Sequence, residues 1–157
     1  MKIVKPIRVA HTFTQTLNAA PDQVFALLCP VREADWIEGW DPLLVVSESG
    51  LAERDCAFIT GSLPSNSYWY VTRHEPDNLF VEMVKLSPGV TACRLTIQVR
   101  ASAPGSTADV VYMHTSLGPE GDAFVETFDA EHYVQFMRDW EERMNHYLTH
   151  GSIKTGA

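Results

Sequence analysis

Three of the six histidines lie among apolar residues, where an imidazole can carry a proton or hold a polar group of a ligand: His11, His114 and His132. Asp129 precedes His132 by three residues, and on a helix this spacing lets a carboxylate orient an imidazole as a general base. The sequence marks no nucleophile for such a base, and aspartate–histidine pairs are common on helix surfaces. We therefore predict no catalytic residue, and proton transfer stays open only if all three histidines point inward.

Metal binding is disfavoured by the spacing of the possible ligands. No His-x-His, His-Glu-x-x-His or paired cysteine and histidine spacing occurs in the sequence. The three cysteines, Cys29, Cys56 and Cys93, are far apart and form no Cys-x-x-Cys pair. Scattered thiols of this kind are typical of reduced, buried side chains. We expect a protein that needs no metal, no cofactor and no disulfide.

Two of the four tryptophans, Trp36 and Trp40, lie in the short segment CPVREADWIEGWD. Large rings in a connector either close the end of a hydrophobic core or border a ligand cavity, and the sequence leaves both readings open. His11 has the same ambiguity because it shares an apolar row with Phe13 and Gln15. Inside a core it would need a hydrogen-bond partner, and beside a cavity it would anchor a polar group of the ligand.

Most charged residues are expected to face solvent. Glu33 and Asp35, next to Arg32, stand at the end of a short helix, where acids are usually solvated. Arg94 and Arg100 alternate with apolar residues in VTACRLTIQVR and belong to the polar row of that strand. The formal net charge of −8 has the wrong sign for a protein that neutralises phosphates, so nucleic acid is not expected as a partner.

The composition is that of a globular protein, with 45% hydrophobic and 20% charged residues. No apolar run approaches the roughly 18 residues of a membrane-spanning helix. The N-terminal segment is interrupted by Pro6, Arg8 and His11 and does not resemble a signal peptide. We expect a cytoplasmic protein without an integral membrane segment, folded as one domain over residues 1–157 with a structured core at about 5–151.

The periodicity of apolar residues predicts the order of the elements. Residues 7–17 alternate as a half-buried strand, and a short helix with one further helical turn follows before residue 39. Six strand-like runs separated by short turns extend to about residue 118, and one long helical pattern covers roughly 120–149. Short connectors favour antiparallel neighbours, so the sequence predicts an α+β fold with a seven-stranded sheet.

This order of elements, together with the segments APDQVFALLCPVREADWIEGW and FMRDWEERMNHYLTHG, resembles the SRPBCC superfamily, also called the START or Bet v 1-like helix-grip fold. The resemblance covers about residues 5–151 and is nearest to uncharacterised bacterial members grouped with polyketide cyclases and lipid-transport proteins. It implies a curved sheet wrapped around the long C-terminal helix, with a hydrophobic cavity between them. Activity does not follow from the resemblance, because this fold carries many functions.

Carried onto this sequence, the resemblance implies a set of candidate ligand-binding residues: His11, Phe13, Trp36, Trp40, Phe58, Trp69, Met83, Leu95, Tyr112, His114, Phe128 and His132. It also implies that Phe136, Trp140 and Met144 pack tightly on the sheet, whereas Phe128 and His132 pass over the cavity.

Three function hypotheses follow. The first is a carrier for a small hydrophobic molecule such as a lipid, isoprenoid or polyketide-like aromatic. The second is a cyclase or dehydratase, and the third is a protein-interaction module with a filled core. Aromatic residues on both faces of some strands leave a homodimer open.

Overall fold

The computed structural model describes residues 1–61 and 65–156, and within them seven strands form one antiparallel sheet, as predicted. The strand order is β1-β7-β6-β5-β4-β3-β2, so every neighbouring pair except β1 and β7 is consecutive in the chain. The tip of the predicted connector SLPSNS, residues 62–64, lies outside the described residues. The strands are β1 (Arg8–Leu17), β2 (Leu44–Val46), β3 (Ala57–Thr60), β4 (Ser67–Glu75), β5 (Phe80–Ser87), β6 (Thr91–Ser102) and β7 (Gly105–Ser116).

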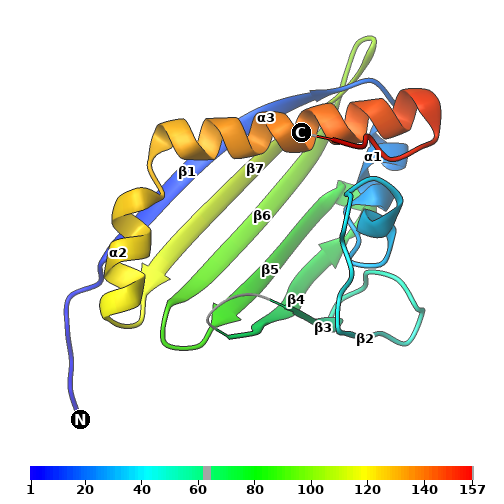
Figure 1. The fold of residues 1–157 in the computed structure, drawn as a ribbon. Coiled ribbons are helices and arrows are strands. Elements are labelled where there is room, and N and C mark those ends of the chain that lie inside the picture. Colours follow the sequence, from blue (N-terminus) through cyan, green and yellow to red (C-terminus); the bar gives the residue numbers. More distant parts are fainter. Residues whose placement is uncertain (62–64, 157) are drawn as a thin grey trace.

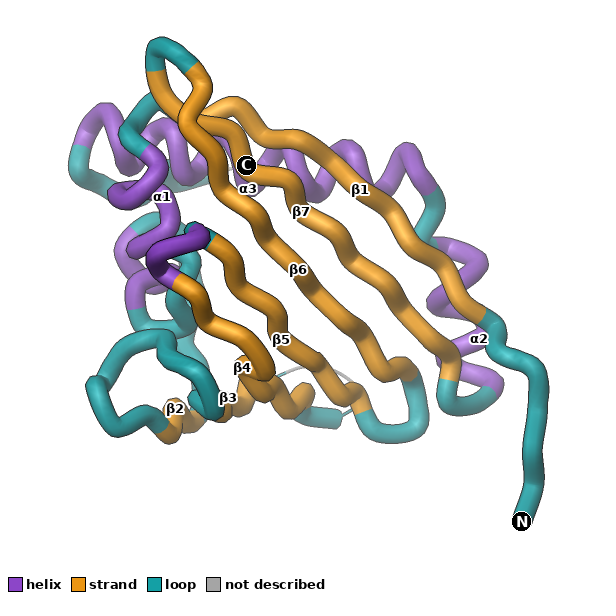
Figure 2. Tube along the Cα trace, turned by 180° about the vertical axis from the view of Figure 1, so that it is seen from behind, coloured by secondary structure: helices purple, strands orange, loops and turns teal. Residues whose placement is uncertain are grey.

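The helices lie between β1 and β2, between β4 and β5, and after β7. They are α1 (Pro21–Leu27), the 3-10 helices η1 (Arg32–Asp35) and η2 (Pro76–Asn78), α2 (Pro119–Thr127) and α3 (Ala130–His150). Figure 1 shows α3 crossing one face of the sheet near β1 and β7. In the view from behind, α3 lies on the far side of the strands (Figure 2). The sheet therefore has a helix-facing side and an outer side.

The predicted single helix over 120–149 is wrong in one respect, because the structure divides it into α2 and α3. In a continuous helix the amide of His132 would donate to the carbonyl of Phe128. Instead that amide donates to Oδ1 of Asp129, the N-cap of α3, at 2.8 Å. The carbonyl of Phe128 accepts a hydrogen bond from Nε2 of His11 at 2.9 Å. Two side chains thus replace one helical hydrogen bond, and the chain turns there.

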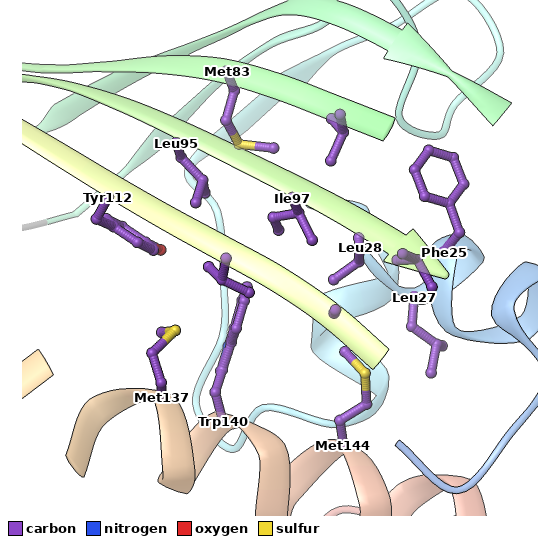
Figure 3. Packing of buried hydrophobic residues seen from close by; sticks show 14 of the residues in the cluster. Phe25, Leu27, Leu28, Met83, Leu95, Ile97, Tyr112, Met137, Trp140 and Met144 are labelled. Atoms are coloured by element: carbon purple, nitrogen blue, oxygen red, sulfur yellow. The ribbon is translucent and has the colours of Figure 1, made fainter. Parts of the chain in front are cut away.

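The hydrophobic core lies between the helix-facing rows of the sheet and the helices. Strand residues alternate between the two faces, and the inward set on β6 and β7 is mainly apolar, with Thr91, Ser106 and His114 as its polar members. Gln15 is buried in this layer and donates to the carbonyl of Met137 at 3.0 Å, so its amide is satisfied. Figure 3 shows side chains from β5, β6 and β7 meeting those of α3. Fully buried members include Leu17, Val24, Trp36, Val71, Val81, Ile97, Val99, Val110, Tyr133, Met137 and Met144.

The Tyr133 hydroxyl ties α3 to the sheet. It donates to the carbonyl of Val110 on β7 at 2.6 Å, and the tyrosine is 1% exposed. Tyr133→Phe keeps the ring and leaves that carbonyl without this buried partner. We expect the variant to lose about 1 kcal/mol of unfolding free energy in chemical denaturation, with an unchanged denaturant dependence. A loss below the error of the measurement would contradict the role assigned to this hydrogen bond.

Among the described residues, no helix is both long and apolar enough to cross a membrane.

Candidate functional site

A cavity of about 630 Å³ lies between the helix-facing side of the sheet, α3 and the connector that follows η1. Its buried wall comes from strands β3, β5, β6 and β7, from α3, and from Phe128 between α2 and α3. Its exposed rim includes Gly39 and Asp41 of the connector, Gly61 after β3, and Phe136 of α3. The buried lining residues are Phe58, Met83, Leu95, Tyr112, His114, Phe128 and Trp140.

Strand register brings the wall residues together. Met83 of β5 is paired with Leu95 of β6, and Leu95 is paired with Tyr112 of β7. Side chains at paired positions share one face and lie about 5 Å apart at Cβ. Figure 3 shows these three side chains pointing toward α3, where Trp140 points back at them. Simple alternation along three strands therefore builds one apolar wall.

The rim carries aromatic and charged side chains. Trp40 is half-buried, and its Nε1 donates to the carbonyl of Pro30 at 2.7 Å, which fixes the ring beside the cavity. On α3, Asp139 accepts from Nε of Arg143 at 2.9 Å, so these two opposite charges are paired at the rim. His132 is exposed there. A ligand would therefore pass polar groups before it reaches the apolar wall.

Nine of the twelve residues predicted to contact a ligand line this cavity; their binding role stays a prediction. The nine are Trp40, Phe58, Trp69, Met83, Leu95, Tyr112, His114, Phe128 and His132. The inward direction of His114, which its strand pattern left open, is settled because its ring is 4% exposed on the helix-facing row.

The other three predicted residues, His11, Phe13 and Trp36, are not among the cavity-lining residues. β1 packs against α3, so its inward row is used by the core, and His11 is satisfied by the carbonyl of Phe128. Trp36 is 0% exposed, donates to the carbonyl of Leu27 at 3.2 Å, and packs on Trp140. Each tryptophan of this segment therefore has one of the two roles that the sequence left open: Trp36 closes the core, and Trp40 borders the cavity.

Glu33 departs from the expectation of a solvated acid. Its half-buried side chain lines the cavity, and no side-chain hydrogen bond or ion pair joins it to another described residue. Burial raises the pKa of Glu33 to about 8. Its neighbour Tyr112 has a pKa well above the ordinary tyrosine value, first because of burial and then because of nearby ionisable groups that include Glu33. Near neutral pH both groups are mainly protonated and can donate hydrogen bonds into the cavity.

Glu33, Lys85 and Phe136 are among the lining residues that sequence reasoning missed. Lys85 follows Val81 and Met83 at alternate positions of LFVEMVKLS, and this alternation is the signal that it faces inward. Arg32 and Asp35, by contrast, pair at the surface at 2.5 Å, while Glu33 between them turns toward the cavity. Arg94 and Arg100 lie on the outer row, as predicted.

Phe136 was expected to pack tightly, but it is 38% exposed and lines the cavity. Its ring meets Tyr112 edge-on at 5.7 Å between centroids. We expect Phe136→Ala to weaken binding of naphthylmethanol several-fold in calorimetric titration and to cost less than about 2 kcal/mol of stability, because little buried surface is lost. Phe80→Ala is the matched control, because Phe80 lies under Arg73 and away from the cavity. Equal binding by both variants would contradict the assignment.

No group of three or more histidine, cysteine, aspartate or glutamate side chains in the described part of the chain is arranged to hold a metal ion. The three cysteines are buried and unpaired by disulfides.

The fold can be compared with known proteins. No protein-family model matches this sequence, and no curated protein sequence matches it. Truncated norcoclaurine synthase from Thalictrum flavum has a similar structure, with a TM-score of 0.70, 13% identity, and coverage of 96% of this chain and 99% of that one. An uncharacterised protein from Rhizobium leguminosarum has a TM-score of 0.67 and 12% identity over 94% and 99% of the two chains. A protein from Rhodobacter sphaeroides has a TM-score of 0.62 and 18% identity over 89% and 91%. With its curved antiparallel sheet and long C-terminal helix, the chain has the Bet v 1-like helix-grip fold.

Proposed function

We propose that this protein binds a small, mainly apolar molecule with an aromatic or polycyclic body in the cavity between the sheet and α3. The observation that carries the proposal is the cavity itself. Its volume of about 630 Å³ lies in the range of roughly 300–1,000 Å³ that is typical of small-molecule sites. Three tryptophans and four phenylalanines contribute to its lining: Trp40, Trp69, Trp140, Phe58, Phe124, Phe128 and Phe136. Lipids, isoprenoids and polyketide-like aromatics are the candidate ligand classes.

The polar groups in the cavity favour a ligand with an uncharged polar end. Glu33 and Tyr112 are protonated near neutral pH and donate hydrogen bonds. Burial and then the positive charge of Lys85 lower the pKa of His114 to about 4, so its imidazole is neutral. Nδ1 lies 3.4 Å from Oγ1 of Thr91, and Nε2 is left as a donor or an acceptor for the ligand. A carbonyl or hydroxyl group can pair with these side chains without adding an uncompensated charge to an apolar site.

The proposal is tested in two steps on the purified protein. Native mass spectrometry followed by solvent extraction first determines whether an apolar molecule co-purifies with the protein. An empty protein is then titrated with naphthylmethanol in a calorimeter, and saturable binding with a negative heat-capacity change is expected. Lack of both a co-purified molecule and saturable binding would overturn the proposal.

Catalysis of the cyclase or dehydratase type is the second candidate, and one observation favours it. Glu33, Tyr112, Lys85 and His114 are four ionisable side chains in one largely apolar cavity, which is the arrangement that acid–base chemistry requires. One solved structure with this fold is norcoclaurine synthase in complex with dopamine and hydroxybenzaldehyde, with a TM-score of 0.66 and 12% identity. Chemical change of a bound polyketide-like substrate would distinguish this candidate from simple binding.

An interaction module is supported by a different surface. Exposed apolar side chains lie on the outer rows of β2, β4 and β5, and the strand register joins those of β2 to those of β4 through Ala57 and Ile59 of β3. The exposed side chains are Leu44, Val46, Tyr68, Tyr70, Val84 and Leu86. A homodimer formed through this face would bury them. Ligand binding remains the preferred function because an interaction module with a filled core does not account for the cavity.

A further inference from the structure

Lys85 is distinguished from the other lysines by its place in the fold. The chain has four lysines, and Lys2, Lys5 and Lys154 belong to the terminal segments. Lys85 instead follows Val81 and Met83 on the helix-facing row of β5 and lines the cavity. No carboxylate of the described residues lies within ion-pair distance of its amine. Burying a lysine in an apolar wall without a counter-charge costs folding free energy. The position of Lys85 therefore points to a role other than stabilising the fold.

The strand register places Lys85 in a transverse row of side chains. Trp69 of β4 is paired with Lys85, Lys85 with Cys93 of β6, and Cys93 with His114 of β7. Nζ of Lys85 lies 5.1 Å from the centroid of the Trp69 ring. Trp69 in turn stacks on Phe58, with 5.2 Å between centroids and 9° between planes. A pair of flat rings thus stands beside the amine on the cavity wall.

The three ionisable groups of this row are all shifted toward their uncharged forms. Burial lowers the pKa of Lys85, with nearby Cys93 as a weaker opposing influence. Burial raises the pKa of Cys93 to about 12 and, together with the charge of Lys85, lowers that of His114 to about 4. Each unit by which an amine pKa falls gives about tenfold more neutral amine at a fixed pH below that value. The neutral amine is the form that attacks a carbonyl carbon.

We propose that Lys85 captures an aldehyde or ketone ligand covalently as an imine, with the aromatic body of the ligand beside Phe58 and Trp69. This inference rests on the proposed function, because the ligand must first enter the cavity. The two rings provide flat apolar contact for a conjugated body, and the amine lies on the same wall. The ligand class is therefore an aromatic or extended conjugated carbonyl compound.

The reaction balances without an added oxidant or reductant. The nitrogen of Lys85 bonds to the carbonyl carbon, the carbonyl electron pair moves to oxygen, and a proton passes from nitrogen to oxygen to give a carbinolamine. The carbon–oxygen bond then breaks, the hydroxyl group leaves with a second proton as water, and the nitrogen lone pair forms the carbon–nitrogen double bond. Both hydrogens of the released water thus come from the primary amine of Lys85. Neutral His114 lies two strands away on the same row, with Nδ1 at 3.4 Å from Oγ1 of Thr91 and Nε2 left as the ring nitrogen that can exchange the second proton.

The experiment compares naphthaldehyde with naphthylmethanol, which has the same ring system and no carbonyl. The protein is incubated with each compound and reduced with borohydride, which converts an imine into a stable secondary amine. Intact and peptide mass spectrometry then locate the adduct, while calorimetry measures binding of naphthylmethanol. We expect one borohydride-dependent naphthylmethyl adduct on Lys85, at roughly tenfold higher occupancy than on Lys2, Lys5 or Lys154. Lys85→Met, which keeps an unbranched apolar chain, should lose the adduct, and its thermal unfolding is measured to show that the variant is folded.

The outcomes separate this inference from the proposed function. Saturable naphthylmethanol binding without an adduct at Lys85 would overturn imine formation and leave the binding function standing. Equal labelling of all four lysines would also overturn it, because the cavity would then give Lys85 no advantage. Absence of both binding and labelling would overturn the two together. An adduct that persists at unchanged mass in Lys85→Met would assign the chemistry to another amine and contradict the inference.

Discussion

Trp36→Ala is expected to reduce the unfolding free energy by about 3–5 kcal/mol, measured by chemical denaturation, because the ring fills a fully enclosed position. Trp36 is 0% exposed, and its ring lies 5.4 Å from that of Trp140. Its removal leaves a void between the η1 segment and α3 and leaves the carbonyl of Leu27 without its indole donor. The loss therefore combines cavity formation with an unmade buried hydrogen bond.

Trp40→Ala is the matched variant, since it removes the same side chain four residues later. Trp40 is half-buried on the cavity rim, so its stability loss should stay below about 2 kcal/mol, while affinity for naphthylmethanol should fall several-fold. Similar stability losses in the two variants, with no change in binding for Trp40→Ala, would contradict the division between core and rim.

Glu33→Gln is expected to stabilise the protein at pH values above the ordinary glutamate pKa. The pKa is about 8 in the folded state against 4.5 for an ordinary glutamate, so folding binds a proton between these values. The native protein consequently loses stability as pH rises from about 4.5 to 8, and below this window the contribution vanishes. Glutamine carries no such penalty. Because the half-buried side chain faces the cavity, we expect a gain of about 1–3 kcal/mol near pH 8.

The measurement is the unfolding free energy of both proteins at several pH values from 4 to 9, a range that spans the interval over which Glu33 titrates. The difference should be small at the acid end and grow up to about pH 8. Glu38→Gln is the matched control, because Glu38 is an exposed acid at the rim and its difference should not follow this profile. A constant difference across the range would show that Glu33 ionises normally in the folded protein.

Much of the fold follows from the sequence because strand alternation and turn residues are local signals. The row Thr91, Cys93, Leu95, Ile97 and Val99 is apolar enough to fix which face of β6 points inward, and the exposure of Arg94 follows from it. The break between α2 and α3 is a different case. It depends on Asp129 acting as an N-cap and on His11, more than a hundred residues away, binding the carbonyl of Phe128. A contact so distant in sequence leaves no periodic signal.

The cavity could be predicted in outline but not residue by residue. Met83, Leu95 and Tyr112 line it because they occupy inward strand positions, which alternation indicates. Glu33 lies on a short 3-10 turn, where one residue of rotation decides between solvent and cavity. Phe136 belongs to the same helix as buried Met137 and Trp140 but sits at the edge of the apolar stripe, where the helical pattern alone does not separate core from cavity.

The most direct test of a ligand cavity at this site is the response of the tryptophan indole N–H signals to naphthylmethanol in heteronuclear NMR. Trp40, Trp69 and Trp140 line the cavity, whereas Trp36 is sealed in the core. We predict saturable shifts of the Trp40 and Trp69 signals with one common dissociation constant, and a smaller shift for Trp36. If naphthylmethanol leaves the Trp40 and Trp69 signals in place at saturating concentration, the cavity does not bind a molecule of this class and the account is wrong.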